Sequence, residues 1–199
     1  MKKFTALLLI LAALLCGCGE EPAPTEAPET SAPGTEPEQA QLGYALGCVM
    51  PNVYATNAQG ETVELHRILE EKKLVVLNFW FADCPWCVKE FPAIELAYQN
   101  YKTDMEILAL SPIDSQEEID AFRQEHGLNF PMSGCSQQLT NLLGVRGYPT
   151  SVFIDREGKI SLIHSGAITD NRVWNQLFDH YLREDYKHRA YASVEDILR

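Results

Sequence analysis

The chain has 199 residues, enough for one ordinary domain with short appendages, and its 46% of hydrophobic residues allow a packed core. Its formal net charge of −12 argues against nucleic acid or an anionic membrane surface as a binding partner. Charged residues make up 22%, as in ordinary soluble proteins, so the acidity indicates solubility rather than a particular ligand.

The first part of the chain, residues 1–17, is typical of a secretory signal. Lys2 and Lys3 form a basic start, and an apolar run of twelve residues with one Thr follows to Leu15. Such a run is shorter than the roughly 20 residues that cross a bilayer. It ends at Cys16-Gly17-Cys18, which resembles a bacterial lipobox, so we expect Cys18 to carry the lipid. The protein would then be anchored at the extracytoplasmic face of the cell membrane. An uncleaved anchor or a plain signal peptide is the alternative.

Residues 18–41 predict a disordered tether. They are rich in Pro, Glu, Thr, Ala and Ser and contain neither aromatic nor basic residues. A segment of this composition buries too little apolar surface to offset the entropy lost on ordering. We therefore expect the folded domain to span residues 42–199.

The folded part alternates between strand and helix patterns. A short β-hairpin is expected over residues 52–65, followed by one or two helical turns to residue 73. Continuous apolar runs predict strands, and apolar residues at helical spacing predict helices. The expected strands are 74–81, 106–110, 150–155 and 160–164, and the expected helices are 84–101, 115–126, 137–143 and 170–186, with the tail to residue 199 continuing the last helix. This order indicates a mixed α/β sandwich with parallel strands inside and an antiparallel edge.

A cysteine pair lies where a buried strand passes into a helix. Cys84 falls in the first helical turn, where the helix dipole and unpaired N–H groups favour a thiolate. Cys87, one turn further, faces the same side. Cys84 would attack a substrate disulfide, and Cys87 would resolve the mixed disulfide; the same steps reversed would oxidise a substrate.

Other uses of this pair fit less well. A zinc ribbon needs a second ligand pair, and covalent haem attachment needs His after the second Cys, where Val88 stands. None of the His residues has a ligand-like partner in the sequence, so we expect no metal. A purely structural disulfide would close a tiny loop and stabilise almost nothing.

Two segments carry a family resemblance: LVVLNFWFADCPWCVKEFP, residues 74–92, and GVRGYPTSVFIDREGK, residues 144–159. Together they resemble the TlpA/ResA-like branch of the thioredoxin superfamily, over about residues 42–186. The resemblance implies a thioredoxin-like three-layer sandwich, with a mixed sheet and an N-terminal β-hairpin. It also implies an enzyme that reduces disulfides of exported proteins, apocytochrome c being a typical client, with electrons from a membrane thiol donor. We expect no cofactor.

The same resemblance suggests roles for individual residues. It implies a cis peptide between Tyr148 and Pro149, in a loop beside the cysteine pair that contacts an extended substrate. Glu90 stands where the family carries an acidic residue, and it would accept a proton or shift the thiol pKa values. Independently of the resemblance, we expect Trp86 and Trp80 to form an apolar platform around the sulfurs, with Trp86 contacting the substrate, although Trp80 equally fits simple core packing.

Three positions depart from the family patterns. Trp86, inside the cysteine pair, replaces the Pro common in reductants, which leaves the redox potential open. Asn78 stands where thioredoxins proper have a buried Asp, so the proton-accepting role would pass to Glu90. Asp83 precedes the first cysteine, where Trp is common; it would cap the helix and raise the Cys84 pKa. A less stabilised thiolate makes the dithiol a better reductant, so Asp83 favours a reducing role.

The sequence leaves open how the other two cysteines of the folded domain are used, and which related function the protein has. Cys48 and Cys135 are expected to form a second disulfide; free thiols, or an electron relay through one of them, are the alternatives. The function of the Cys84–Cys87 pair also has alternatives, since the same pair could serve an oxidant or isomerase of exported protein disulfides. A peroxidase would need a single activated Cys in another loop, which we do not find, and a copper carrier would need wider Cys spacing plus a His ligand.

Overall fold

The computed structural model describes residues 41–57 and 59–199. The expected signal, the lipidation site Cys18 and all of the expected tether except residue 41 lie outside the described residues. Within the described ranges, no helix is both long and apolar enough to cross a bilayer.

A five-stranded mixed sheet forms the centre of the domain, with strand order β5-β4-β3-β6-β7. The strands are β3 (Leu74–Phe79), β4 (Met105–Ser111), β5 (Met132–Gly134), β6 (Thr150–Asp155) and β7 (Ile160–Ser165). The β3, β4 and β5 strands are parallel, whereas β6 and β7 are antiparallel to their neighbours. Every residue of β3 is buried, as expected for a central strand covered on both faces.

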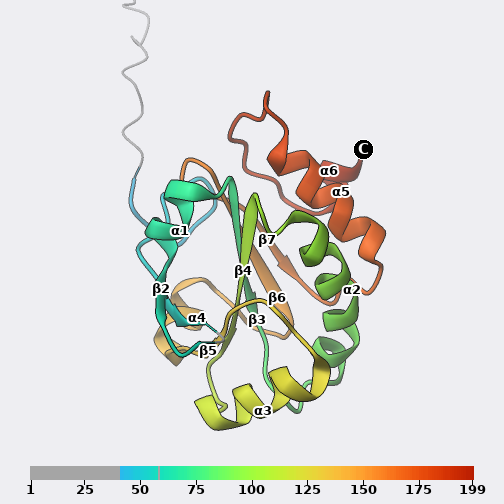
Figure 1. Cartoon of the computed structure of the whole chain (residues 1–199). Helices are drawn as coiled ribbons and strands as arrows, with labels where there is room; N and C mark the ends of the chain where they lie inside the picture. Colours follow the sequence, from blue (N-terminus) through green and yellow to red (C-terminus); the bar gives the residue numbers. More distant parts are fainter. Residues whose placement is uncertain (1–40, 58) are drawn as a thin grey trace, which may run out of the picture. The chain divides into compact units, whose positions relative to one another are not determined.

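Helices cover both faces of this sheet (Figure 1). One face packs against the apolar sides of α2 (Pro85–Tyr101), α3 (Gln116–His126) and α5 (Asn171–Leu182). The other face packs against α1 (Leu65–Glu71), α4 (Gln137–Leu142) and the antiparallel hairpin of β1 (Tyr54–Thr56) and β2 (Thr62–Glu64). The predicted three-layer α/β sandwich with an N-terminal hairpin is thus confirmed.

Two elements differ from the sequence prediction. The three-residue strand β5 was not predicted, because its Met-Ser-Gly sequence is too short to show alternation. The last long helix ends at Leu182, and the tail forms an irregular segment with a short helix, α6 (Glu195–Leu198). This tail folds back on the sheet, since Tyr191 bridges to Leu162 of β7.

The expected disulfide between Cys48 and Cys135 is wrong: both are free thiols. The carbonyl of Cys48 accepts a hydrogen bond from Ile160, the first residue of β7. Cys135 directly follows β5, at the opposite edge of the sheet. The two cysteines are thus attached to strands at opposite edges of the sheet.

Candidate redox site

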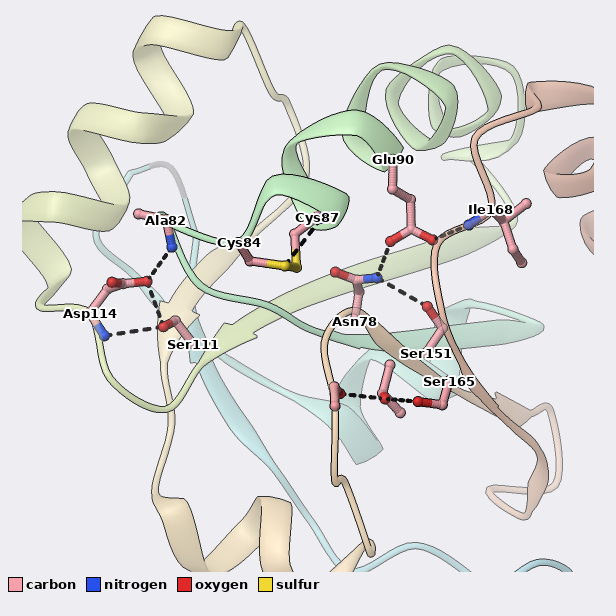
Figure 2. Close-up of a disulfide and its surroundings, with 12 residues drawn as sticks. Asn78, Ala82, Cys84, Cys87, Glu90, Ser111, Asp114, Ser151, Ser165 and Ile168 are labelled. Carbon is pink, nitrogen blue, oxygen red and sulfur yellow. Dashed lines mark hydrogen bonds between the residues drawn. A yellow bond between two sulfur atoms is a disulfide. The ribbon is translucent and has the colours of Figure 1, made fainter.

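The cysteine pair lies where β3 leads into α2. Cys84 is the N-cap residue of α2, and its sulfur accepts a hydrogen bond from the Cys87 backbone N–H at 3.2 Å. Pro85 occupies the first helical position, where its missing N–H is no loss. Cys84 and Cys87 form a disulfide, with their Cα atoms 5.3 Å apart (Figure 2). Cys84 thus lies at the start of the helix, as the sequence predicts, but as the cap residue immediately before the first turn.

The two sulfur-bearing residues differ in access. Cys84 is 3% exposed, whereas Cys87 is fully buried. Cys84 is therefore the sulfur-bearing residue that an incoming thiol can reach. This asymmetry is what a nucleophile and an internal resolving thiol require.

Asp83 does not cap α2, contrary to the sequence prediction. Because the helix begins at Pro85, the cap position falls on Cys84, and Asp83 lies exposed in the preceding turn. That turn is closed by a hydrogen bond from the Cys84 N–H to the Phe81 carbonyl at 3.1 Å. Asp83 is thus next to the nucleophile in sequence, but its carboxylate does not cap the helix.

Glu90 is a buried carboxyl on the face of α2 that carries Cys87. One oxygen accepts the Ile168 backbone N–H at 2.8 Å, and the other accepts the Asn78 amide N–H at 3.1 Å (Figure 2). Burial raises the pKa of Glu90 from 4.5 to about 7, and these two hydrogen bonds oppose the rise. Glu90 therefore titrates near neutral pH, the range in which a carboxylate can exchange protons with a thiol.

The structure adds a contact that the sequence did not reveal. Asp114, in the loop after β4, accepts hydrogen bonds from the Ala82 N–H at 2.8 Å and the Ser111 hydroxyl at 2.7 Å (Figure 2). This carboxylate holds the turn before Cys84 against the end of the neighbouring strand. Asp114 is 30 residues beyond Cys84, and only its position after a buried strand could have drawn attention to it.

The proline loop lies against the segment that leads to Cys84. The Tyr148–Pro149 peptide is cis, as expected. The Tyr148 ring packs edge-on against Phe81, with ring centroids 5.3 Å apart. Register explains the proximity, because Thr150 after the loop pairs with Phe79 at the end of β3. The second motif is thereby brought beside the first.

The two tryptophans near the pair lie in different environments. Trp86, between the cysteines, is 58% exposed, and the Lys89 ammonium lies 4.3 Å from the centre of its ring. Trp80 is fully buried and packs against Phe91 and Phe122. Trp86 is thus available to a partner, whereas Trp80 belongs to the core. In the described part of the chain, no group of three or more His, Cys, Asp or Glu side chains could hold a metal ion.

A thioredoxin-like sheet with a Cys-x-x-Cys disulfide at a helix start and a cis proline alongside defines a thiol–disulfide oxidoreductase. Comparison with known proteins agrees with this class. The chain belongs to the AhpC/TSA family, whose model matches residues 46–163.

Named relatives fall in the same class. The thiol-disulfide oxidoreductase ResA of Halalkalibacterium halodurans is 32% identical over 124 residues, which cover 61% of this chain and 69% of ResA. The exposed lipoprotein thioredoxin of Streptococcus pneumoniae is 25% identical, with a TM-score of 0.53, covering 65% of this chain and 98% of that chain. The thioredoxin domain of a Bacteroides vulgatus thiol-disulfide oxidoreductase shares the fold, with a TM-score of 0.58 at 23% identity, covering 67% and 98% of the two chains.

Proposed function

We propose that this oxidoreductase is lipid-anchored through Cys18 at the extracytoplasmic face of the cell membrane, where it reduces disulfides of exported proteins. The observation that carries the redox part is the disulfide between an N-cap cysteine that keeps a slight exposure and a fully buried cysteine one turn on. The signal-like and lipobox-like sequence supports the location, as does the similarity to a pneumococcal exposed lipoprotein.

In this proposal, the reduced Cys84 thiolate attacks a client disulfide and forms a mixed disulfide. Cys87 then attacks the Cys84 sulfur, which breaks the mixed disulfide and leaves the Cys84–Cys87 disulfide, and the two client thiolates released in the two steps take protons from water. Glu90 takes up the proton of the Cys87 thiol during this second step. A membrane thiol donor returns two electrons and two protons to the pair. Apocytochrome c is one client class that the resemblance to ResA-like proteins suggests.

The surface around the pair would bind the client as an extended segment. Tyr148 and Pro149 would lie along the client backbone, and the exposed ring of Trp86 would pack against its side chains. Asp83 would disfavour the negative thiolate at Cys84 through like-charge repulsion, which favours the reducing direction.

The redox part is tested by insulin reduction with the purified protein. We expect Cys84→Ala to abolish turnover, and Cys87→Ala to accumulate mixed disulfides because the resolving thiol is missing. Cys135→Ala is the matched control and should keep full activity, since burial raises the pKa of that thiol to about 12 and leaves little thiolate. Normal turnover by Cys84→Ala would overturn the assignment.

The direction is tested by the equilibrium of the pair with glutathione. A potential near about −270 mV would support the reductant, whereas one near about −120 mV would favour the oxidant or isomerase. Rapid peroxide consumption by the purified protein, independent of Cys87, would instead favour a peroxidase.

The anchor is tested separately by cell fractionation and mass spectrometry. We expect the protein to stay with the membrane and the N-terminal peptide of the processed chain to carry a lipid mass on Cys18. Cys18→Ala should lose both the lipid and the membrane association, whereas Cys16→Ala should keep both. Retention of the same lipid mass in Cys18→Ala would show that the anchoring residue lies elsewhere.

A further inference from the structure

The side-chain amide of Asn78 has hydrogen-bond partners for its nitrogen but none for its oxygen among the described residues. Its nitrogen donates to Glu90 at 3.1 Å and to the Ser151 hydroxyl at 3.0 Å. Its oxygen is fully buried and has no hydrogen-bond partner among the described residues. A buried acceptor left without a donor is costly and uncommon, so its position calls for a chemical reason.

This unpartnered oxygen points toward the redox centre. Figure 2 shows the Asn78 nitrogen turned toward Glu90 and Ser151, and its oxygen turned toward the Cys84–Cys87 disulfide. Strand geometry agrees, because Val76, two residues before Asn78 in β3, and Trp80, directly after the strand, belong to the same core cluster as Cys87. Asn78 is thus on the face of the sheet that α2 covers.

Glu90 fixes this orientation. An ionised carboxylate only accepts hydrogen bonds, so it holds the N–H end of the amide, and the oxygen must face the other way. A disulfide has no proton to donate. Reduction of the pair places an S–H group on the buried Cys87, which creates the donor that the amide oxygen lacks.

We infer that Asn78 is a positioning residue that accepts a hydrogen bond from the Cys87 thiol in the reduced enzyme. This inference rests on the proposed redox function and deepens it. Asn78 neither takes nor gives a proton; it holds the resolving thiol on the Asn78 side of the pair until Cys84 has engaged a client. Because the bond exists only in the dithiol, it stabilises the reduced form relative to the disulfide.

The first test reads the hydrogen bond itself by infrared spectroscopy at pH 8.5, where Glu90 is ionised. The S–H stretching band of Cys87 is isolated as the difference between Cys84→Ala and Cys84→Ala/Asn78→Leu, because the bands of the other thiols cancel. We expect the band to move to higher frequency and to narrow when Asn78 is replaced by Leu. An unchanged band would overturn the inference. This arm needs no turnover, so it stays informative even if the proposed function fails.

The second test compares the glutathione equilibrium of the wild type, Asn78→Leu and Ser151→Ala, quantified on the peptide that carries both cysteines. Two glutathione thiols supply the electrons and protons and leave as glutathione disulfide. We expect Asn78→Leu to shift the equilibrium about fivefold toward the protein disulfide, or roughly 20 mV at about 29.6 mV per tenfold. Ser151→Ala removes a hydrogen bond from the same amide but spares its oxygen, and should leave the equilibrium unchanged.

A purely structural role for Asn78 would destabilise the oxidised and reduced proteins equally. The equilibrium of Asn78→Leu would then match that of the wild type although its melting temperature falls, and this outcome would overturn the inference. Failure of the proposed function looks different: the wild type itself would not reduce insulin, while the infrared shift would persist.

Discussion

At the scale of single residues, the chemistry of the site depends on one buried carboxyl. Glu90 keeps its place because a backbone N–H and an amide N–H replace part of its hydration. These two donors do not fully compensate for burial, which leaves its pKa near 7. Burying an ionisable carboxyl costs folding free energy, so a carboxyl that is buried all the same is a candidate for a functional role.

This burial predicts a pH-dependent stability. The folded-state pKa of Glu90 is raised from 4.5 to about 7, so the folded form binds a proton between these values and the unfolded form does not. The free energy of unfolding should therefore fall as pH rises through this window. At roughly 1.4 kcal/mol per pH unit, the loss approaches about 3 kcal/mol.

Glu90→Gln should lack this loss. We expect the stability difference between Glu90→Gln and the wild type to grow in favour of the variant between pH 4.5 and pH 7.5, measured by urea denaturation of the oxidised proteins. Glu125→Gln removes an exposed carboxyl on α3 and should follow the wild type. Parallel pH profiles for Glu90→Gln and the wild type would contradict the prediction.

At the scale of secondary-structure elements, sequence signals placed most helix starts within one residue. The start of α3 shows why: the Ser115 hydroxyl accepts the Glu118 N–H, and the Glu118 carboxylate accepts the Ser115 N–H. This capping box involves residues only three positions apart, so it can be predicted from the local sequence. The end of α3 is equally local, since Gly127 adopts the left-handed conformation with φ of 64°.

The cap predicts a measurable contribution to stability. Ser115→Ala should lower the free energy of unfolding by about 1 kcal/mol, because the Glu118 N–H loses its acceptor. Ser115→Asp supplies another acceptor and should restore most of the loss. Both are measured by chemical denaturation; equal stability of the Ala and Asp variants would show that the capping bond contributes nothing.

At the scale of the whole molecule, one end of the sheet carries the redox site and the other end binds the C-terminal segment. The disulfide lies beyond the end of β3, where Phe79 pairs with Thr150. The opposite end, where Leu74 pairs with Asp155, anchors the C-terminal segment. The fully buried Asp155 carboxylate accepts a hydrogen bond from the Tyr186 hydroxyl at 3.0 Å and contacts His188 at 2.6 Å.

This separation predicts that stability and activity can be changed independently. Tyr186→Ala should cost about 3 kcal/mol of unfolding free energy through lost packing, and Tyr186→Phe about 1 kcal/mol through the lost hydroxyl. Insulin reduction per folded molecule should be unchanged in both. A large loss of activity in fully folded Tyr186→Phe would mean that the two ends of the sheet are coupled.

The sequence by itself determined the class of this protein. Apolar runs specify buried strands, helical spacing and caps specify the helices, and two cysteines at a strand–helix junction specify redox chemistry, because all these signals act between near neighbours. Tertiary structure alone decided which groups surround the sulfurs. Ile168 reaches Glu90 across 78 positions, and Asp114 reaches Ala82 across 32. Such contacts, and the burial that moves the Glu90 pKa, exist only once distant segments pack together, and the same packing leaves Cys48 and Cys135 as free thiols.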